Sequence, residues 1–129
     1  MIWYVAIGGA VGSASRFLLG ATVQRWSGVP FPIGTLVVNV TGCFLFAFLM
    51  RYALATSLFT PDVRALVTTG FCAGYTTFST FSYESIALLD SGEYWRAGLY
   101  VFLSVALSLL GTIAGLAAAR HVLTLGERV

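Results

Sequence analysis

Long apolar segments alternate with short polar ones along the whole chain. About 20 apolar residues in a helix cross a bilayer, and four segments approach that length. The breaks between them hold Gly, Pro or charged residues, as in "QRWSGVPFP" after the first segment. This pattern predicts an all-α integral membrane protein, a single four-helix domain over residues 1–129 with spans over residues 2–23, 33–55, 63–89 and 94–123.

The composition supports a membrane protein and excludes several other classes. The chain is 58% hydrophobic and 9% charged, with a mean hydropathy of +0.89, whereas a soluble domain needs a far more charged surface. The net charge of +2 includes no basic run, so nucleic acid is not an expected partner. Cys43 and Cys72 lie far apart in apolar segments and are expected to be small core residues.

The distribution of arginines bears on orientation. Four spans place both termini on one side of the membrane, and the connecting segments then carry four Arg on that side against two on the other: Arg51, Arg64, Arg120 and Arg128 against Arg25 and Arg96. Because the Lys/Arg bias sets orientation, so small a difference permits insertion both ways.

Three GxxxG pairs recur in the apolar segments: Gly8 with Gly12, Gly70 with Gly74, and Gly111 with Gly115. Small residues at this spacing let membrane helices approach closely. The pairs are compatible with packing inside one four-helix subunit and with an oligomer interface, and the sequence leaves both open. Since four short helices enclose little volume, a conduit favours an oligomer.

The third segment has a polar centre, "TTGFCAGYTTFSTFSYES". Gly70, Gly74, Thr76 and Thr77 weaken helix propensity there, so we expect this helix to be broken near its middle. A break at membrane depth is tolerated where it is buried in protein or lines an ion site. The freed carbonyl oxygens would be hard ligands suited to Na⁺. Upstream, Thr60-Pro61 is typical of a helix start, with Thr60 as the cap.

Two polar side chains stand inside apolar spans. Arg16 is costly to bury without a partner; it either pairs with a carboxylate or helix-end carbonyls, or it attracts anions at a water-filled mouth. Asn39 offers two donors and one acceptor, and it either clamps two helices together or donates to a permeating ligand.

Six further residues could serve either packing or anion transport. Tyr100, Ser104 and Ser108 share one helix face, which favours a hydrated track over chance packing. Phe78 and Phe81 are either packing residues or rings whose electropositive edges face a small anion. Glu84 is a candidate gate, proton-linked group or capped structural acid.

Two motifs, "GTLVVNVTG" and "TTGFCAGYTTFSTFSYE", closely resemble those of the Fluc (CrcB) fluoride channels, as do the length and the four-span layout. The resemblance implies an antiparallel, dual-topology homodimer with two fluoride pores, embedded in the lipid of the cytoplasmic membrane. It implies passive export of fluoride and fluoride resistance, and a structural Na⁺ at the dimer interface.

The same resemblance assigns residues to these sites. Arg16 corresponds to an arginine near the aqueous vestibule, and the carbonyls of Ala73 and Thr76 to the Na⁺ ligands. Relatives often have two consecutive glycines where this chain has Ala73-Gly74, which matters if the break needs a positive φ. The pore residues are then Asn39, Thr77, Phe78, Ser79, Thr80, Phe81, Glu84, Tyr100, Ser104 and Ser108.

Other functions fit less well. A small dual-topology multidrug exporter is the alternative, but it would need a carboxylate in the first span, where this chain has Arg16. A non-conducting structural subunit would leave the polar face of Tyr100, Ser104 and Ser108 unexplained. An enzyme is not expected, because no nucleophile–base pair or metal cluster can be assembled.

Overall fold

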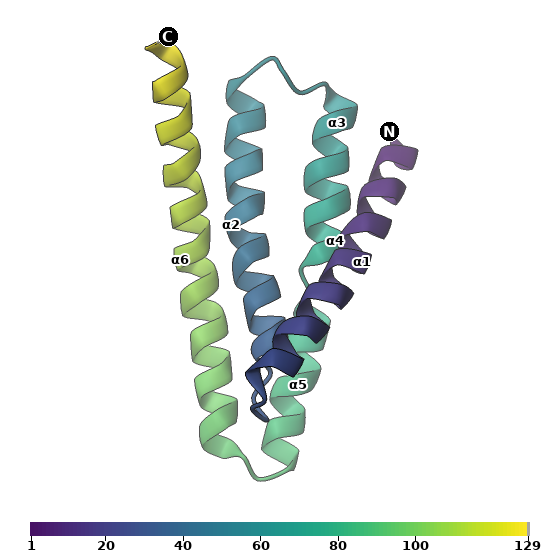
Figure 1. The fold of residues 1–129 in the computed structure, drawn as a ribbon, viewed down its shortest axis with the longest axis vertical. Coiled ribbons are helices and arrows are strands. Elements are labelled where there is room, and N and C mark those ends of the chain that lie inside the picture. Colours follow the sequence, from purple (N-terminus) through teal and green to yellow (C-terminus); the bar gives the residue numbers. More distant parts are fainter. Residues whose placement is uncertain (129) are drawn as a thin grey trace.

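The computed structural model describes residues 1–128, and its regular elements are all helical (Figure 1). The two termini lie toward the same end of the bundle. Among the described residues, three helices, α1, α2 and α6, are long and apolar enough to cross a membrane. In chain order the elements are α1 (Ile2–Ser27), α2 (Ile33–Ala55), α3 (Pro61–Ala65), the π-helix η1 (Leu66–Cys72), α4 (Ala73–Tyr75), α5 (Phe78–Asp90) and α6 (Tyr94–Glu127).

Local signals place the helix ends. Gly28 closes α1 in the left-handed conformation, with φ 61°, which glycine adopts without steric cost. Thr60 caps α3 as predicted: its Oγ1 accepts a hydrogen bond from the Val63 amide at 3.2 Å, and Pro61 occupies the first helical position.

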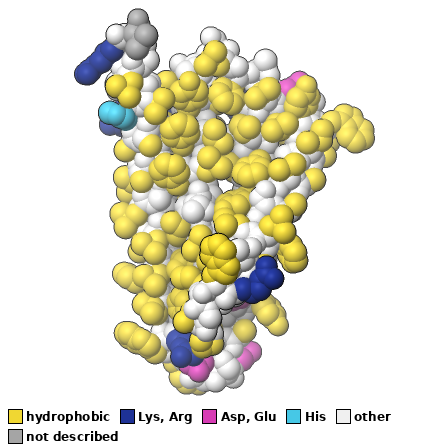
Figure 2. All heavy atoms as spheres, viewed as in Figure 1, with side chains coloured by type: hydrophobic (Ala, Val, Ile, Leu, Met, Phe, Trp, Pro, Cys, Tyr) yellow, Lys and Arg dark blue, Asp and Glu magenta, His cyan; other side chains and the backbone are white. Residues whose placement is uncertain are grey.

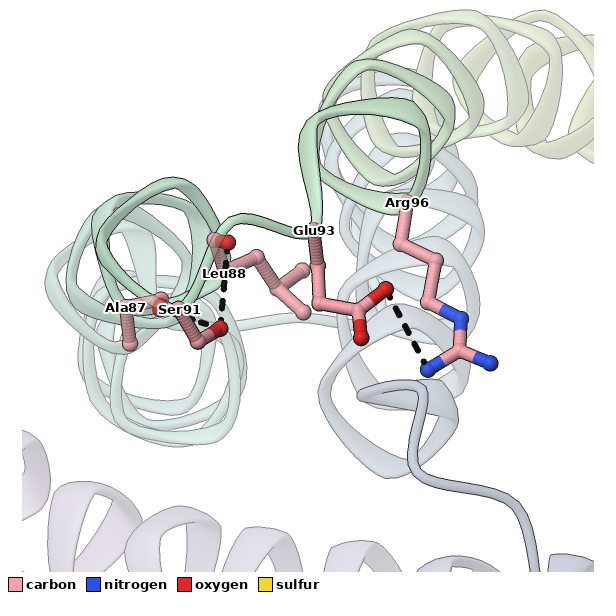
Figure 3. Close-up of polar contacts among 5 residues, drawn as sticks. All are labelled: Ala87, Leu88, Ser91, Glu93 and Arg96. Carbon is pink, nitrogen blue, oxygen red and sulfur yellow. Dashed lines mark hydrogen bonds and ion pairs between the residues drawn. The ribbon is translucent and has the colours of Figure 1, made fainter.

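Figure 3 shows the turn between the end of α5 and the start of α6. The Ser91 hydroxyl donates to the carbonyls of Ala87 and Leu88, at 3.0 and 3.1 Å. Arg96 Nη1 lies 3.5 Å from Glu93 Oε2 in a half-exposed pair. An exposed pair of this kind contributes little stability. The turn depends mainly on its backbone hydrogen bonds, from the Gly92 amide to Leu89 O at 3.0 Å and from the Glu93 amide to Leu88 O at 2.9 Å.

The segment between α2 and α6 changes conformation several times. The α-helical turn α3 widens into η1, narrows again in α4, and ends where Thr76 and Thr77 are extended before α5 begins. Ala73 is in the ordinary right-handed helical region, with φ −69° and ψ −33°. The chain therefore does not require a second glycine at this position.

The GxxxG glycines pack inside the chain. The face of Gly8 and Gly12 meets that of Gly70 and Gly74, so that a Cβ atom added at Gly74 would lie 2.7 Å from the Gly9 carbonyl oxygen. Gly111 and Gly115 meet α2 in the same manner, at the carbonyls of Val40 and Phe44. Close contacts between α1 and η1–α4, and between α2 and α6, thus account for all three pairs.

The outer surface is strongly apolar. Figure 2 shows hydrophobic side chains over most of the visible face, with few charged groups. Large side chains such as Phe17, Phe102 and Ile113 are 73%, 67% and 62% exposed. Exposure of apolar area on this scale would be unfavourable in water, so these faces are suited to lipid or to another protein surface.

Candidate functional site

The site is centred on the two extended residues between α4 and α5. Thr76 has φ −84° and ψ 158°, and Thr77 has φ −150° and ψ 115°. β-Branched threonine is a weak helix former, and here the Thr77 hydroxyl oxygen accepts from the Thr80 amide at 3.1 Å, which caps α5. The local sequence thus ends one helix and begins the next.

Asn39 of α2 holds this extended backbone from the side. Its Nδ2 donates to the Thr77 carbonyl at 3.0 Å, and its Oδ1 accepts from the Thr77 amide at 2.8 Å. The clamp considered from the sequence is therefore present. The Asn39 NH₂ group carries two hydrogens, and the bond to Thr77 uses one of them, so clamping and donation to a ligand are compatible.

The bond from the Thr77 amide to Asn39 replaces a helical one. In a continuing helix the Thr77 amide would donate to the carbonyl of Ala73, but it donates to Asn39 instead. Two side chains of α1 reach the neighbouring carbonyls: Ser13 Oγ donates to Gly74 O at 3.4 Å, and Arg16 Nη1 to Thr76 O at 3.3 Å. Of the two partners considered for Arg16, a helix-end carbonyl is the one that the structure shows.

A cavity of about 310 Å³ lies beside the clamp. It brings together residues from α2, the extended pair, α5 and α6: Asn39, Cys43, Thr76, Thr77, Phe78, Phe81, Ser104, Val105, Ser108 and Leu109. Within the described residues 1–128, the buried hydroxyl of Ser104, a residue that is 7% exposed, has no hydrogen-bond partner. A buried hydroxyl without a partner is costly, so this position is suited to a ligand or water.

The two phenylalanines lie at the edge of this cavity. Their ring centroids are 5.5 Å apart, with the planes inclined by 49°. Phe81 also packs on Tyr100, with centroids 5.3 Å apart. Phe78 is 79% exposed, so the cavity is open on the side where this ring lies.

Glu84, three residues after Phe81 on α5, accepts two hydrogen bonds. Thr35 Oγ1 donates to Oε1 at 2.7 Å, and the fully buried Tyr100 donates to Oε2 at 3.1 Å. Of the three roles considered for Glu84, the structure shows the contacts of a capped acid. Thr35 was not singled out from the sequence, although it stands four residues before Asn39 on the same helix face.

A larger cavity, of about 740 Å³, opens between α1, α2 and α5. Arg16, Thr80 and Glu84 line it, and Thr77 lines both cavities. Ser79 is exposed, and its hydroxyl lies 3.3 Å from that of Thr77. Most of the predicted residues therefore line one of two cavities, with Thr77 at both, whereas Ala73, Ser79 and Tyr100 line neither.

Two of the three residues on the predicted polar face of α6 lie at the cavity beside the clamp. Ser104 and Ser108 line it, whereas the Tyr100 hydroxyl is turned to Glu84. The polar face of α6 therefore runs from the cavity that Asn39 lines to the hydrogen bond between Tyr100 and Glu84. That these residues bind a permeating anion stays a prediction.

Comparison with known proteins identifies the family. The model described as CrcB-like protein, Camphor Resistance (CrcB), matches residues 3–116. A protein of Geobacter sulfurreducens named "Fluoride-specific ion channel FluC" is 50% identical over 117 residues, 91% of this chain and 94% of its own.

Further relatives carry the same name. The protein of Roseobacter denitrificans is 46% identical over 92% of this chain and 94% of its own length. That of Aquifex aeolicus is 44% identical over 89% of this chain and 96% of its own. The resemblance seen in the sequence motifs is confirmed, and the chain belongs to the CrcB family.

Proposed function

We propose that this chain forms a fluoride-selective channel that lets fluoride leave the cell passively across the cytoplasmic membrane and so confers fluoride resistance. The relatives in the same family are named as fluoride-specific ion channels. Three apolar helices long enough to span a bilayer make the chain a multi-pass membrane protein. The prediction that it is not an enzyme is confirmed by its membership of a channel family.

The buried, unpartnered hydroxyl of Ser104 is the observation that carries the proposal. Ser104 lines a cavity that Asn39, Phe78 and Phe81 also line. Fluoride is a small and tightly hydrated anion, so a pore must replace its water with hydrogen-bond donors. Hydroxyl and amide groups supply those donors, while aromatic edges add weak contacts that allow the ion to leave.

The functional unit is proposed to be an antiparallel homodimer with two pores. The third membrane span is then discontinuous, running from α3 to α5 through the extended Thr76–Thr77 pair. The exposure of Phe78 supports a second chain, since the cavity that it borders lacks a wall. The nearly balanced arginines support insertion in both orientations, and the whole chain is proposed to be one membrane domain.

A structural Na⁺ between the two chains is part of this proposal. The Thr77 amide, which would donate to the Ala73 carbonyl in a continuing helix, donates to Asn39 instead, and Ala73 is an exposed residue; both observations support a carbonyl oxygen that could face another chain. Thr76 O already accepts from Arg16 at 3.3 Å, and a carbonyl oxygen has a second lone pair. Carbonyl oxygens are ligands of hard cations. The ion would neutralise these partial charges at the bilayer midplane.

Membership of the CrcB family speaks against the alternative of a multidrug exporter. The experiment that tests the proposal is fluoride efflux from liposomes containing the purified protein, followed with a fluoride electrode. We expect efflux of fluoride and retention of chloride. Liposomes that keep both anions, or that release both equally, would refute a fluoride-selective channel.

A further inference from the structure

One side chain holds the connection between α1 and α2. Gln24 Nε2 donates to the carbonyls of Val29 and Phe31, at 3.1 and 2.9 Å, and its Oε1 accepts from the Gly34 amide at 3.0 Å. Both amide hydrogens and one oxygen lone pair are thereby used. The connection has three proline or glycine residues and no regular structure of its own. The three Gln24 bonds therefore hold much of its conformation, together with the bond from the Ile33 amide to the Phe31 carbonyl at 2.7 Å.

The connection in turn supports the Tyr100 ring. Phe31 meets Tyr100 edge to face, with centroids 5.5 Å apart and planes at 85°. Phe81 contacts the same ring, with centroids 5.3 Å apart. Tyr100 is fully buried, and the two neighbouring rings restrict where its hydroxyl can point.

The Tyr100 hydroxyl connects this support to Glu84. It donates to Glu84 Oε2 at 3.1 Å, while Thr35, one residue after Gly34, donates to Oε1. Gln24 therefore acts on both sides of the carboxylate: through Phe31 on the tyrosine, and through Gly34 on the start of α2. Gln24, Phe31, Thr35 and Glu84 also line the larger cavity.

We propose that Gln24 is a positioning residue, which fixes the Tyr100–Glu84 pair by holding Phe31 and the start of α2 in place. The inference rests on the proposed channel function, because its main readout is fluoride flux. The three bonds require two donors and an acceptor in one uncharged group. Glutamate supplies no donors and lysine no acceptor, so neither substitutes for glutamine.

The test is a double-mutant cycle between Gln24 and Tyr100. Gln24→Met keeps the shape of the side chain and removes its three hydrogen bonds, and we expect fluoride flux to fall about tenfold. Tyr100→Phe removes the hydroxyl that meets Glu84. In that background, Gln24→Met should lower flux by clearly less than tenfold, because its route through the Tyr100 hydroxyl is gone and only the route through Gly34 and Thr35 to Glu84 remains.

The matched control is Thr22→Val, on the same turn of α1, whose hydroxyl donates only within its own helix, to Leu18 O at 2.7 Å. It should leave flux unchanged. Equal losses from Gln24→Met in the wild-type and Tyr100→Phe backgrounds would overturn the inference, as would normal flux in Gln24→Met. A wild-type protein that carries no fluoride would instead refute the channel function, which separates the two failures.

A readout independent of flux uses 3-fluorotyrosine incorporation and ¹⁹F NMR, with the Tyr100 resonance assigned by its loss in Tyr100→Phe. We expect Gln24→Met to shift or broaden that resonance and Thr22→Val to leave it in place. An unchanged resonance in Gln24→Met would overturn the inference. If Gln24→Met does not fold, Phe31→Leu applies the same two measurements with the Gln24 hydrogen bonds retained.

Discussion

Asn39 and Thr77 are joined by two hydrogen bonds, one in each direction. The side-chain amide donates to the Thr77 carbonyl at 3.0 Å and accepts from the Thr77 amide at 2.8 Å. The pairing satisfies both backbone groups of an extended residue inside an apolar bundle, where each unsatisfied group would be costly. It also brings a polar side chain of α2 to the cavity that Ser104 faces.

Asn39→Ala tests this pairing. It leaves the amide and carbonyl of Thr77 without a partner, and we expect a loss of about 1–3 kcal/mol of stability together with a loss of fluoride flux. Thermal unfolding in detergent and liposome efflux measure the two effects. Thr22→Val, whose hydroxyl bonds only within its own helix, is the control. Unchanged stability in Asn39→Ala would contradict a clamping role.

Substitutions that conserve apolar volume test the role of the Phe78–Phe81 ring pair. Phe78→Ile and Phe81→Ile should leave the fold intact, because volume-conserving apolar changes are tolerated, but each should slow or abolish fluoride efflux. Phe102→Ile, at an α6 position that is 67% exposed, is the matched control and should conduct normally. If both ring variants ran at the normal rate, the two phenylalanines would be packing residues only.

Orientation in the membrane follows from the balance of arginines, four against two. Protein carrying a tag at one terminus should be found in both orientations. Two lysines added to the connection between α2 and α3 should lock a single orientation, which tag accessibility in intact cells would show. A single orientation of the unmodified chain would rule out the antiparallel homodimer.

Removal of Na⁺ tests the proposed ion between the chains. With Na⁺ replaced by a bulky organic cation, dimer stability and fluoride flux should fall together, because the freed Ala73 and Thr76 carbonyls would lose a ligand. Size-exclusion chromatography, thermal unfolding and efflux in matched buffers measure this. Equal stability and flux without Na⁺ would leave the extended Thr76–Thr77 pair as a packing feature.

The sequence predicts much of the helical layout and only part of the site. Hydropathy predicts an apolar segment over residues 33–55, and α2 has those bounds, because apolar length and the Pro residues before it act locally. Thr35 could have been found from its spacing to Asn39. The partner of Arg16 could not be found from the sequence. It is the backbone carbonyl of Thr76, 60 residues away, and every residue type has such a carbonyl. Gln24 was missed for the same reason: its three partners are backbone groups.

The central claim is that fluoride passes the cavity beside the Asn39–Thr77 pair, and Ser104→Ala tests it most directly. This change removes the buried hydroxyl that has no partner, so stability should stay the same or rise. Fluoride efflux should fall about tenfold or more, because a hydrogen bond to a charged ligand is strong.

The matched control for that measurement is Ser85→Ala, a buried serine whose hydroxyl donates to its own helix at Phe81 O, 2.7 Å away. The account predicts slow fluoride efflux with unchanged thermal stability for Ser104→Ala, and normal efflux for Ser85→Ala. Normal efflux in a folded Ser104→Ala protein would contradict the account, since fluoride would then pass without the Ser104 hydroxyl.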